Sequence, residues 1–319
     1  MRAGASTVVV AVFLVACGDG VDDWDGVRNP LLGFDDAAIK DAYLVHDGDT
    51  WHLGYSRATA DPFRFQLGFA SSPNLRDFTI GDTLDQPDTG GLASPTVVRA
   101  PDGRWLMTYN SHTRDIGDSL NKLYYRTSDD LATWSAATRI HIDGVDDPSE
   151  RLIDAAVAFT DTGAYLFFKR DQIANVAYAA SGSIDGPWTL LGELSQRNLE
   201  NLQPILIDGT WHLLGTTIPL VHDAVLHRLD GDPTAPASWR NWTVVRTLTV
   251  EEQSWNTGPL LDHERSNAAF LVDDRPADGY FYLLYAGSTD LTSFEGRGHA
   301  KLGLARSRDL QTWDAAPER

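Results

Sequence analysis

The stretch PDGRWLMTYN (Pro101–Asn110) joins an Asp-Gly pair to a strand-like run of alternating aromatic and apolar residues. An Asp-Gly pair between two apolar runs is the strongest short sequence signal for a β-hairpin. The same form, a turn followed by an alternating strand, occurs in four further stretches: DGDTWHLGYS (47–56), DTGAYLFFKR (161–170), IDGTWHLLGT (207–216) and ADGYFYLLYA (277–286). The sequence therefore predicts one hairpin that is repeated five times.

A second repeated element follows the hairpins. It consists of a polar turn, then a hydrophobic residue or Gly, then an aromatic, as in SSPNLRDFT (71–79), TSDDLATWS (127–135), SGSIDGPWT (181–189) and SRDLQTWD (307–314). Trp242 supplies the aromatic between the last two copies, so that the aromatics from Phe78 to Trp242 lie about 55 residues apart. A fixed spacing of this length is typical of repeat architectures.

The two repeated elements together predict five four-stranded units. Their expected bounds are Phe34–Thr83, Leu92–Arg139, Arg151–Leu191, Asn198–Val245 and Trp255–Trp313. Radial repetition of such units is a β-propeller, so the predicted fold class is all-β, a five-bladed β-propeller. A two-sheet sandwich is the all-β alternative, but it does not explain a five-fold repeat. No stretch has sustained helical periodicity, which argues against a doubly wound α/β fold. Extra length between Pro259 and Asp278 is interpreted as a loop on the binding face.

Composition narrows the class of protein. The chain has 319 residues, a formal net charge of −19 and ten Trp. Phosphate binding needs clustered Lys and Arg, so this charge argues against nucleic acid as a partner and against a polybasic membrane patch. It suits an exported protein with a neutral or cationic substrate, although surplus acid that keeps the protein soluble explains it equally well.

The N-terminus predicts export. A basic start at Arg2 precedes an apolar run, Val8–Ala16, that is too short to span a bilayer and is typical of a signal peptide. LVAC (14–17) resembles a bacterial lipoprotein cleavage site, in which Cys17 is lipidated; an ordinary secretory signal is the alternative. We therefore expect a signal peptide at 1–17, a tether at 18–33 and a propeller domain at 34–319. The expected location is the cell envelope, on the periplasmic or outer-surface side, with the lipid as the sole membrane contact and a monomeric chain.

Three acids open the innermost strand of a blade, each ten or eleven residues before that blade's hairpin aromatic: Asp41 before Trp51, Asp154 before Tyr165, and Glu200 before Trp211. The equivalent in blade two is Ser94, and blade five offers no clear equivalent. The innermost strands of a propeller run in one direction around the channel, so residues at their starts converge on one mouth. The sequence therefore predicts three carboxylates in one pocket. The plainer alternative is that each acid ends a turn before a strand.

Grouped carboxylates repel one another, so at least one pKa among them is expected to rise. A protonated carboxylic acid beside an ionised carboxylate is what glycosidic bond cleavage needs. One protonates the leaving oxygen, and the other activates water. The pattern therefore points to glycoside hydrolysis.

These five repeats and the three acids resemble the five-bladed propeller glycoside hydrolases of family 43 and, more distantly, of family 62, from about Phe34 to Trp313. Members include α-L-arabinofuranosidases, β-xylosidases and arabinanases. The resemblance implies that Asp41 is the general base, that Asp154 adjusts the pKa of the acid and orients it, and that Glu200 is the general acid. It also implies inversion, for which the base and acid carboxyls lie roughly 6.5–9.5 Å apart.

The chain departs from the family pattern beside each acid. The family commonly has Pro after each Asp, where Ala42 and Ala155 stand here, and Gly or Ala and then Pro after the Glu, where residues 201–203 precede Pro204. Two other functions therefore stay open. One is a catalytically silent carbohydrate-binding lipoprotein, and the other is a fructan-type hydrolase that retains configuration.

Further candidate residues surround the predicted site. Trp255, in a loop outside the repeats, is predicted as an aromatic platform for a sugar. Family members often hold a central cation such as calcium near a channel His, for which His52, His212 and His299 are candidates, although a strand or surface position is expected for each. No metal or cofactor is otherwise expected. Lys169 and Arg170 could contact substrate, but exposure on the surface is the expected position for both. Cys17 is the only cysteine, which excludes intramolecular disulfides and Cys-based metal clusters.

Overall fold

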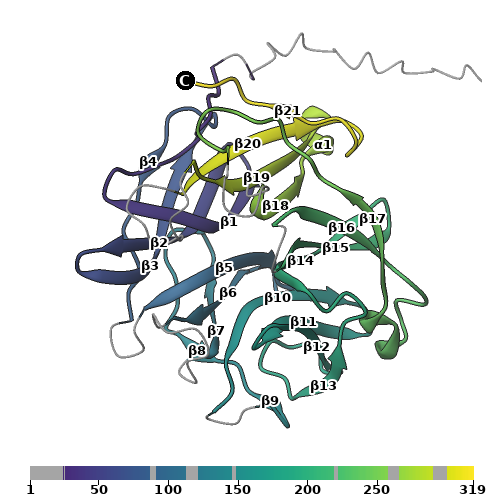
Figure 1. Cartoon of the computed structure of the whole chain (residues 1–319). Helices are drawn as coiled ribbons and strands as arrows, with labels where there is room; N and C mark the ends of the chain where they lie inside the picture. The colour runs from purple at the N-terminus through teal and green to yellow at the C-terminus, as the bar shows by residue number, and fades with distance from the viewer. Residues whose placement is uncertain are drawn as a thin grey trace, which may run out of the picture.

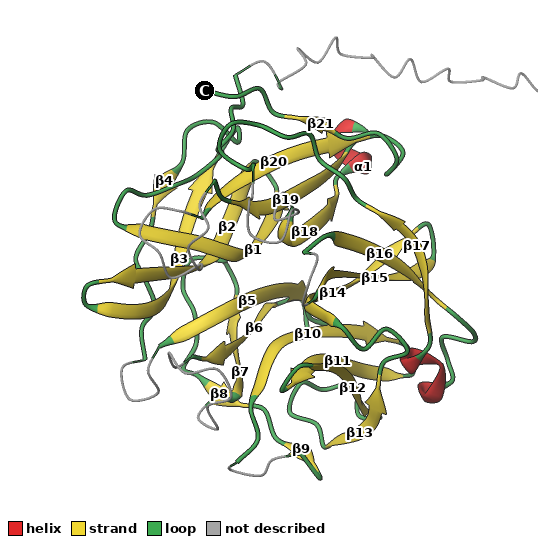
Figure 2. Ribbon diagram, in the orientation of Figure 1, coloured by secondary structure: helices red, strands yellow, loops and turns green. Residues whose placement is uncertain are grey.

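The computed structural model describes residues 24, 26–86, 91–112, 121–145, 149–218, 222–257, 266–289 and 300–319. Within these residues the strands form five sheets around a common centre, one for each predicted repeat (Figure 1). Figure 2 shows that strands dominate and that the short helical turns, Pro236–Arg240 and Arg275–Asp278, lie at the periphery. The prediction of an all-β, five-bladed β-propeller is confirmed.

The strands of each blade follow one another in the chain and pair antiparallel with their neighbours. Blade one contains β1 (Ala37–Asp47), β2 (Thr50–Ala60), β3 (Phe63–Ser72) and β4 (Thr79–Ile80). Blade two contains β5 (Leu92–Arg99), β6 (Trp105–Ser111), β7 (Leu123–Ser128) and β8 (Thr138–Arg139). Blade three contains β10 (Leu152–Thr160), β11 (Gly163–Arg170), β12 (Ile173–Ala179) and β13 (Trp188–Glu193), and β9 (Ile142–Asp143) adds a parallel edge strand to it.

Blade four contains β14 (Leu199–Ile207), β15 (Thr210–Thr217), β16 (Ala224–Leu229) and β17 (Trp242–Thr247), with a 3₁₀ turn at Pro236–Arg240. Blade five contains β18 (Asn267–Asp273), β19 (Phe281–Gly287), β20 (Lys301–Ser307) and β21 (Asp314–Ala315), with α1 (Arg275–Asp278) between its first two strands. Part of the length that was interpreted as a binding-face loop is therefore β18, the innermost strand of blade five, and α1. The prediction was wrong for 267–278, whereas 258–265 lie outside the described residues.

The second repeated sequence element is a turn that supplies its own hydrogen bonds. In blades one, two and five a Ser hydroxyl contacts an Asn or Asp two residues later, and that side chain accepts backbone N–H groups of the turn: Ser72 with Asn74, Ser128 with Asp130, and Ser307 with Asp309. The N–H groups of Thr133 and Ala132 lower the pKa of Asp130 to about 2. Such local bonds explain why the turn recurs as a sequence pattern.

The start of the described chain belongs to the propeller. Trp24, Val27 and Leu31 are buried in the largest core cluster. The fully buried Asn29 side chain bonds to the Tyr285 hydroxyl and to both backbone groups of Leu304. The tether predicted for 18–33 is therefore wrong from Trp24 onward, because apolar side chains in this segment pack between blades one and five. Residues 1–17, with the predicted lipid site at Cys17, lie outside the described residues.

No helix in the described part of the chain is both long enough and apolar enough to cross a membrane.

Candidate active site

Each innermost strand has a register shift at the same place. There one residue of each blade takes a positive φ: Asp41 (48°), Ser94 (55°), Asp154 (57°), Asn201 (50°) and Ala268 (49°). A positive φ is costly for residues other than glycine, and it is tolerated where the surroundings fix the backbone. A bulge re-aims the side chains around it. The five bulges therefore bring one residue from every blade to the centre.

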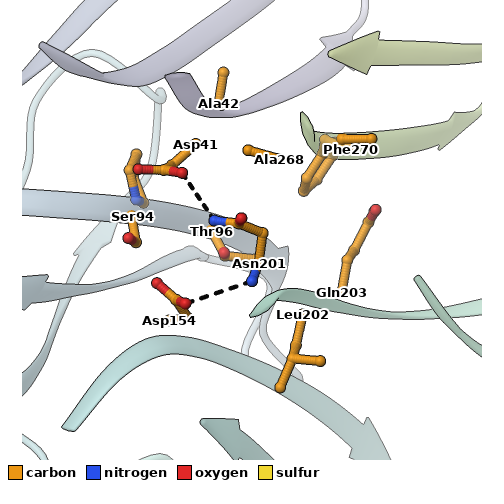
Figure 3. A pocket seen from close by; sticks show the side chains of 12 residues that line it. Asp41, Ala42, Ser94, Thr96, Asp154, Asn201, Leu202, Gln203, Ala268 and Phe270 are labelled. Carbon is orange, nitrogen blue, oxygen red and sulfur yellow. Dashed lines mark hydrogen bonds between the residues drawn. The ribbon is translucent and has the colours of Figure 1, made fainter. Parts of the chain in front are cut away.

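These five bulge residues line a central cavity of about 20 Å³ (Figure 3). A space of this size accommodates about one water molecule. The predicted equivalence of Asp41, Ser94 and Asp154 holds. The predicted place of Glu200 in this series is wrong by one residue, since the bulge residue of blade four is Asn201. Glu200 precedes the bulge and lies nearer the start of its strand.

Asp41 and Asp154 are both buried, with 8% and 6% of their surface exposed. Asn201 lies between them and links them (Figure 3). Its side-chain Nδ2 donates to Asp41 Oδ1 at 2.8 Å, and its backbone N–H points to Asp154 Oδ2 at 3.5 Å. Two carboxylates from blades one and three are thus held by one residue of blade four.

Burial raises the pKa of Asp41, because a charged carboxylate loses its hydration there. The Lys40 ammonium, 3.5 Å from Asp41 Oδ1, acts in the opposite direction, while the negative charges of Asp154 and Glu200 add to the rise. Asp154 and Glu200 are thus close enough to Asp41 for their charges to act on it. The pKa of Asp41 is raised, as expected for at least one of the grouped acids, but burial is the largest cause, and repulsion by Asp154 and Glu200 contributes less.

Glu200 has a different environment. Its Oε2 lies 2.8 Å from the Lys169 ammonium, which comes from β11 of blade three. Burial raises the pKa of Glu200, but Lys169 and Lys40 lower it by more, so that the net pKa lies below its usual value. The pKa of Glu200 is therefore lowered and that of Asp41 is raised, which is opposite to the directions expected for a general acid and a general base. Lys169 was expected on the surface, but it is 2% exposed and pairs with Glu200.

Trp255 does not lie at the site. It is buried in the core of blade five, where its ring stacks on Tyr285 at 5.7 Å and its indole N–H donates to Gln253. Its ring also lies so close to Gly303 that a Cβ there would collide with it, and a Cβ at Gly287 would lie 3.0 Å from the ring. A buried ring offers no face to a sugar. The prediction of Trp255 as a binding platform is wrong.

The described residues include no group of three or more His, Cys, Asp or Glu side chains that could hold a metal ion. His52 and His212 belong to β2 and β15, which are second strands, and they pair with Val45 and Ile205 away from the channel. His299 lies outside the described residues. Among the bulge residues the central ring offers two carboxylates, one hydroxyl and one amide, and no histidine, so we assign no chemical step to a central cation.

No protein-family model matches the chain, and no curated protein matches it in sequence. Solved structures do. An α-L-arabinofuranosidase from Podospora anserina, in complex with cellotriose, has a TM-score of 0.61 and 16% identity over 87% of this chain and 94% of that chain. An α-L-arabinofuranosidase from Lactobacillus brevis has a TM-score of 0.61 and 15% identity over 91% and 96%.

An endo-1,5-α-L-arabinanase from Thermotoga petrophila has a TM-score of 0.58 and 12% identity over 89% of this chain and 75% of that chain. The chain has the five-bladed propeller fold of these glycoside hydrolases. With identities this low, the likeness establishes the shared fold, and the chemistry must be argued from the residues at the centre of this propeller.

Sequence reasoning did not identify the role of Asn201 at this propeller site, and it missed the burial of Lys169 and its pairing with Glu200. Asn201 was noted only as a departure from the family pattern, although Asn is among the residues that most readily adopt a positive φ, which is a usable signal. Lys169 is the last buried residue of β11, directly before the partly exposed Arg170 that ends the strand. A lysine near the end of a buried strand gives no sign of its partner, which lies in the next blade.

Proposed function

We propose that this protein is a glycoside hydrolase that cleaves arabinose- or xylose-containing glycans with inversion of configuration. One observation carries the proposal: three acids from three different blades meet at the centre of the propeller, where Asn201 joins Asp41 to Asp154 and the charges of Asp154 and Glu200 act on Asp41. The similar structures support the substrate class, since they include arabinofuranosidases, an arabinanase and an enzyme of family 62 in complex with xylotriose.

The proposed reaction uses two of the acids directly. Glu200 donates a proton to the glycosidic oxygen, which leaves with the electron pair of its bond to the anomeric carbon. Asp41 accepts a proton from a water molecule whose oxygen bonds to that carbon from the opposite side. Asp154 does not transfer a proton. It is a positioning residue that accepts the Asn201 N–H, and Asn201 in turn donates to Asp41.

A direct test uses the chain from Gly18 with aryl α-L-arabinofuranosides, aryl β-D-xylosides, arabinan and arabinoxylan. We expect release of arabinose or xylose, and we expect the proton NMR spectrum of the first product to show the configuration opposite to that of the substrate. A first product with retained configuration would contradict inversion and would favour the fructan-type mechanism.

A second function is favoured by one observation, the ion pair between Lys169 and Glu200. A general acid that is held ionised cannot donate a proton, so a carbohydrate-binding protein without turnover is the alternative. Binding across a glycan panel without product release would support it over hydrolysis.

We also propose that the protein is a lipoprotein of the bacterial cell envelope, anchored through Cys17. The leader sequence supports this, and the propeller packing begins only seven residues later, at Trp24. A Cys17→Ser chain is expected to move from the membrane fraction to the soluble fraction. Retention of that variant in the membrane fraction would contradict the anchor.

A further inference from the structure

The blades are linked at the bulges by a recurring hydrogen bond. In blades one, two and four a side chain of the second strand accepts the N–H of the next blade's bulge residue: Ser56 from Ser94, Asn110 from Asp154, and Thr216 from Ala268. Each acceptor lies opposite the residue before the bulge of its own blade. This position is therefore normally used to join neighbouring blades.

Lys169 occupies that same position in blade three, opposite Ile153. A lysine ammonium has no acceptor atom, so it cannot accept the N–H of Asn201. Asp154 lies near that N–H instead, and the Lys169 ammonium donates to Glu200 Oε2 at 2.8 Å. Blade three thus replaces a structural link with a charged contact to the proposed acid.

The contact is buried, since the Lys169 side chain is 3% exposed and that of Glu200 is 17% exposed. A buried ammonium is strongly disfavoured unless a counter-ion faces it, so this geometry requires Glu200 as its partner. The other groups around Glu200 are Lys40 from β1 and His222 before β16, with Asp41 and Asp154 as the acids of the same region.

We propose that Lys169 is a positioning residue, which orients the Glu200 carboxylate at the channel mouth and holds it as an ion pair while no substrate is bound. The mechanistic meaning rests on the proposed function, but the ion pair itself does not. During hydrolysis Glu200 takes up a proton from solvent, passes it to the leaving oxygen and becomes a carboxylate again. Lys169 then stabilises that carboxylate, and this favours the proton-donation step. The same interaction lowers the fraction of Glu200 that is protonated before the step.

The test is a titration that needs no catalytic activity. The protein is prepared with ¹³C-labelled Glu carboxyls, and the Glu200 signal is assigned by its loss in Glu200→Gln. We expect Lys169→Met to raise the pKa of Glu200 by about 1–3 pH units, the usual effect of removing a close opposite charge. In Lys169→Arg, which keeps the positive charge, Glu200 should titrate at nearly the same pH as in the wild type. The matched control is Arg170→Met, since the neighbouring Arg170 pairs with Glu150 and should leave Glu200 unchanged.

An unchanged Glu200 titration in folded Lys169→Met protein would overturn the proposal, whether or not the protein is a hydrolase. If the Met variant does not fold, Lys169→Gln is used, because it removes the charge and keeps a hydrogen-bond donor. The second measurement is kcat/KM against pH on an aryl glycoside. We expect the break in the profile that belongs to Glu200 to move upward with the NMR titration in Lys169→Met and to stay in place in Arg170→Met. The Glu200 titration could shift in Lys169→Met while the pH profile of kcat/KM stays in place. That result would contradict the role of Glu200 as proton donor, but it would still support the ion pair between Lys169 and Glu200.

Discussion

Replacement of Glu200 by Gln is expected to lower kcat/KM about 10²–10⁴-fold on glycosides with a poor leaving group, the usual contribution of a positioned proton donor. The amide keeps the size of the side chain but cannot donate the proton. On 2,4-dinitrophenyl glycosides the loss should be much smaller, because this leaving group departs without protonation. The measurement is the loss in kcat/KM on glycosides with a poor leaving group, divided by the loss in kcat/KM on 2,4-dinitrophenyl glycosides.

The matched control is Glu193→Gln, since Glu193 is an exposed residue of the same neighbourhood in sequence and pairs with Arg197 at the surface. It should retain full activity. Equal losses on both kinds of substrate in Glu200→Gln would show that Glu200 is not the proton donor.

The second large effect is expected for Asp41→Asn, which should lower kcat about 10²–10⁴-fold on all substrates, whatever the leaving group, because no base then accepts the proton of the attacking water. KM should change little. Burial raises the pKa of Asp41, so its carboxylate takes up a proton at a higher pH than an exposed aspartate does. Activity that depends on ionised Asp41 must therefore fall as the pH falls.

The residual activity of Asp41→Asn should lack this acidic decline, and a pH profile of both proteins checks it. Asp49→Asn, an exposed residue of the hairpin turn after β1, is the control and should keep the wild-type profile. An acidic decline that persists in Asp41→Asn would assign the base to another group, with Glu200 as the first candidate because its pKa is already lowered.

The sites of Asp41 and Asp154 could be located from sequence because each precedes its hairpin by a short and nearly constant distance. Glu200 was misplaced by one residue for a physical reason. The position of a β-bulge depends on how two strands pair, and the spacing to an aromatic in the next strand does not report it. The pairing of β14 with β15 places the bulge at Asn201. Asn201, which departs from the family pattern, is thus also the residue that joins Asp41 to Asp154.

Burial was the harder quantity to predict. Trp255 was expected at the surface because it lies outside the repeats, yet glycines of two strands leave room for its ring inside blade five. Trp24 was assigned to a flexible tether, but it packs against Tyr282 and lies beneath the Arg306 guanidinium. Both tryptophans are placed by residues far away in the chain, which a local pattern cannot identify.

By itself the sequence determined the repeat and therefore the architecture. Turn chemistry and strand alternation act between neighbouring residues, so Asp-Gly hairpins and Ser-Asx turns report directly on local structure. The charges of the site were decided by the tertiary structure alone. Burial at the centre of five blades raises the pKa of Asp41. The pKa of Glu200 is lowered by Lys169, which lies 31 residues earlier in the chain and one blade away. Electrostatic effects depend on distance and solvent exclusion in space, and these exist only once the propeller has closed.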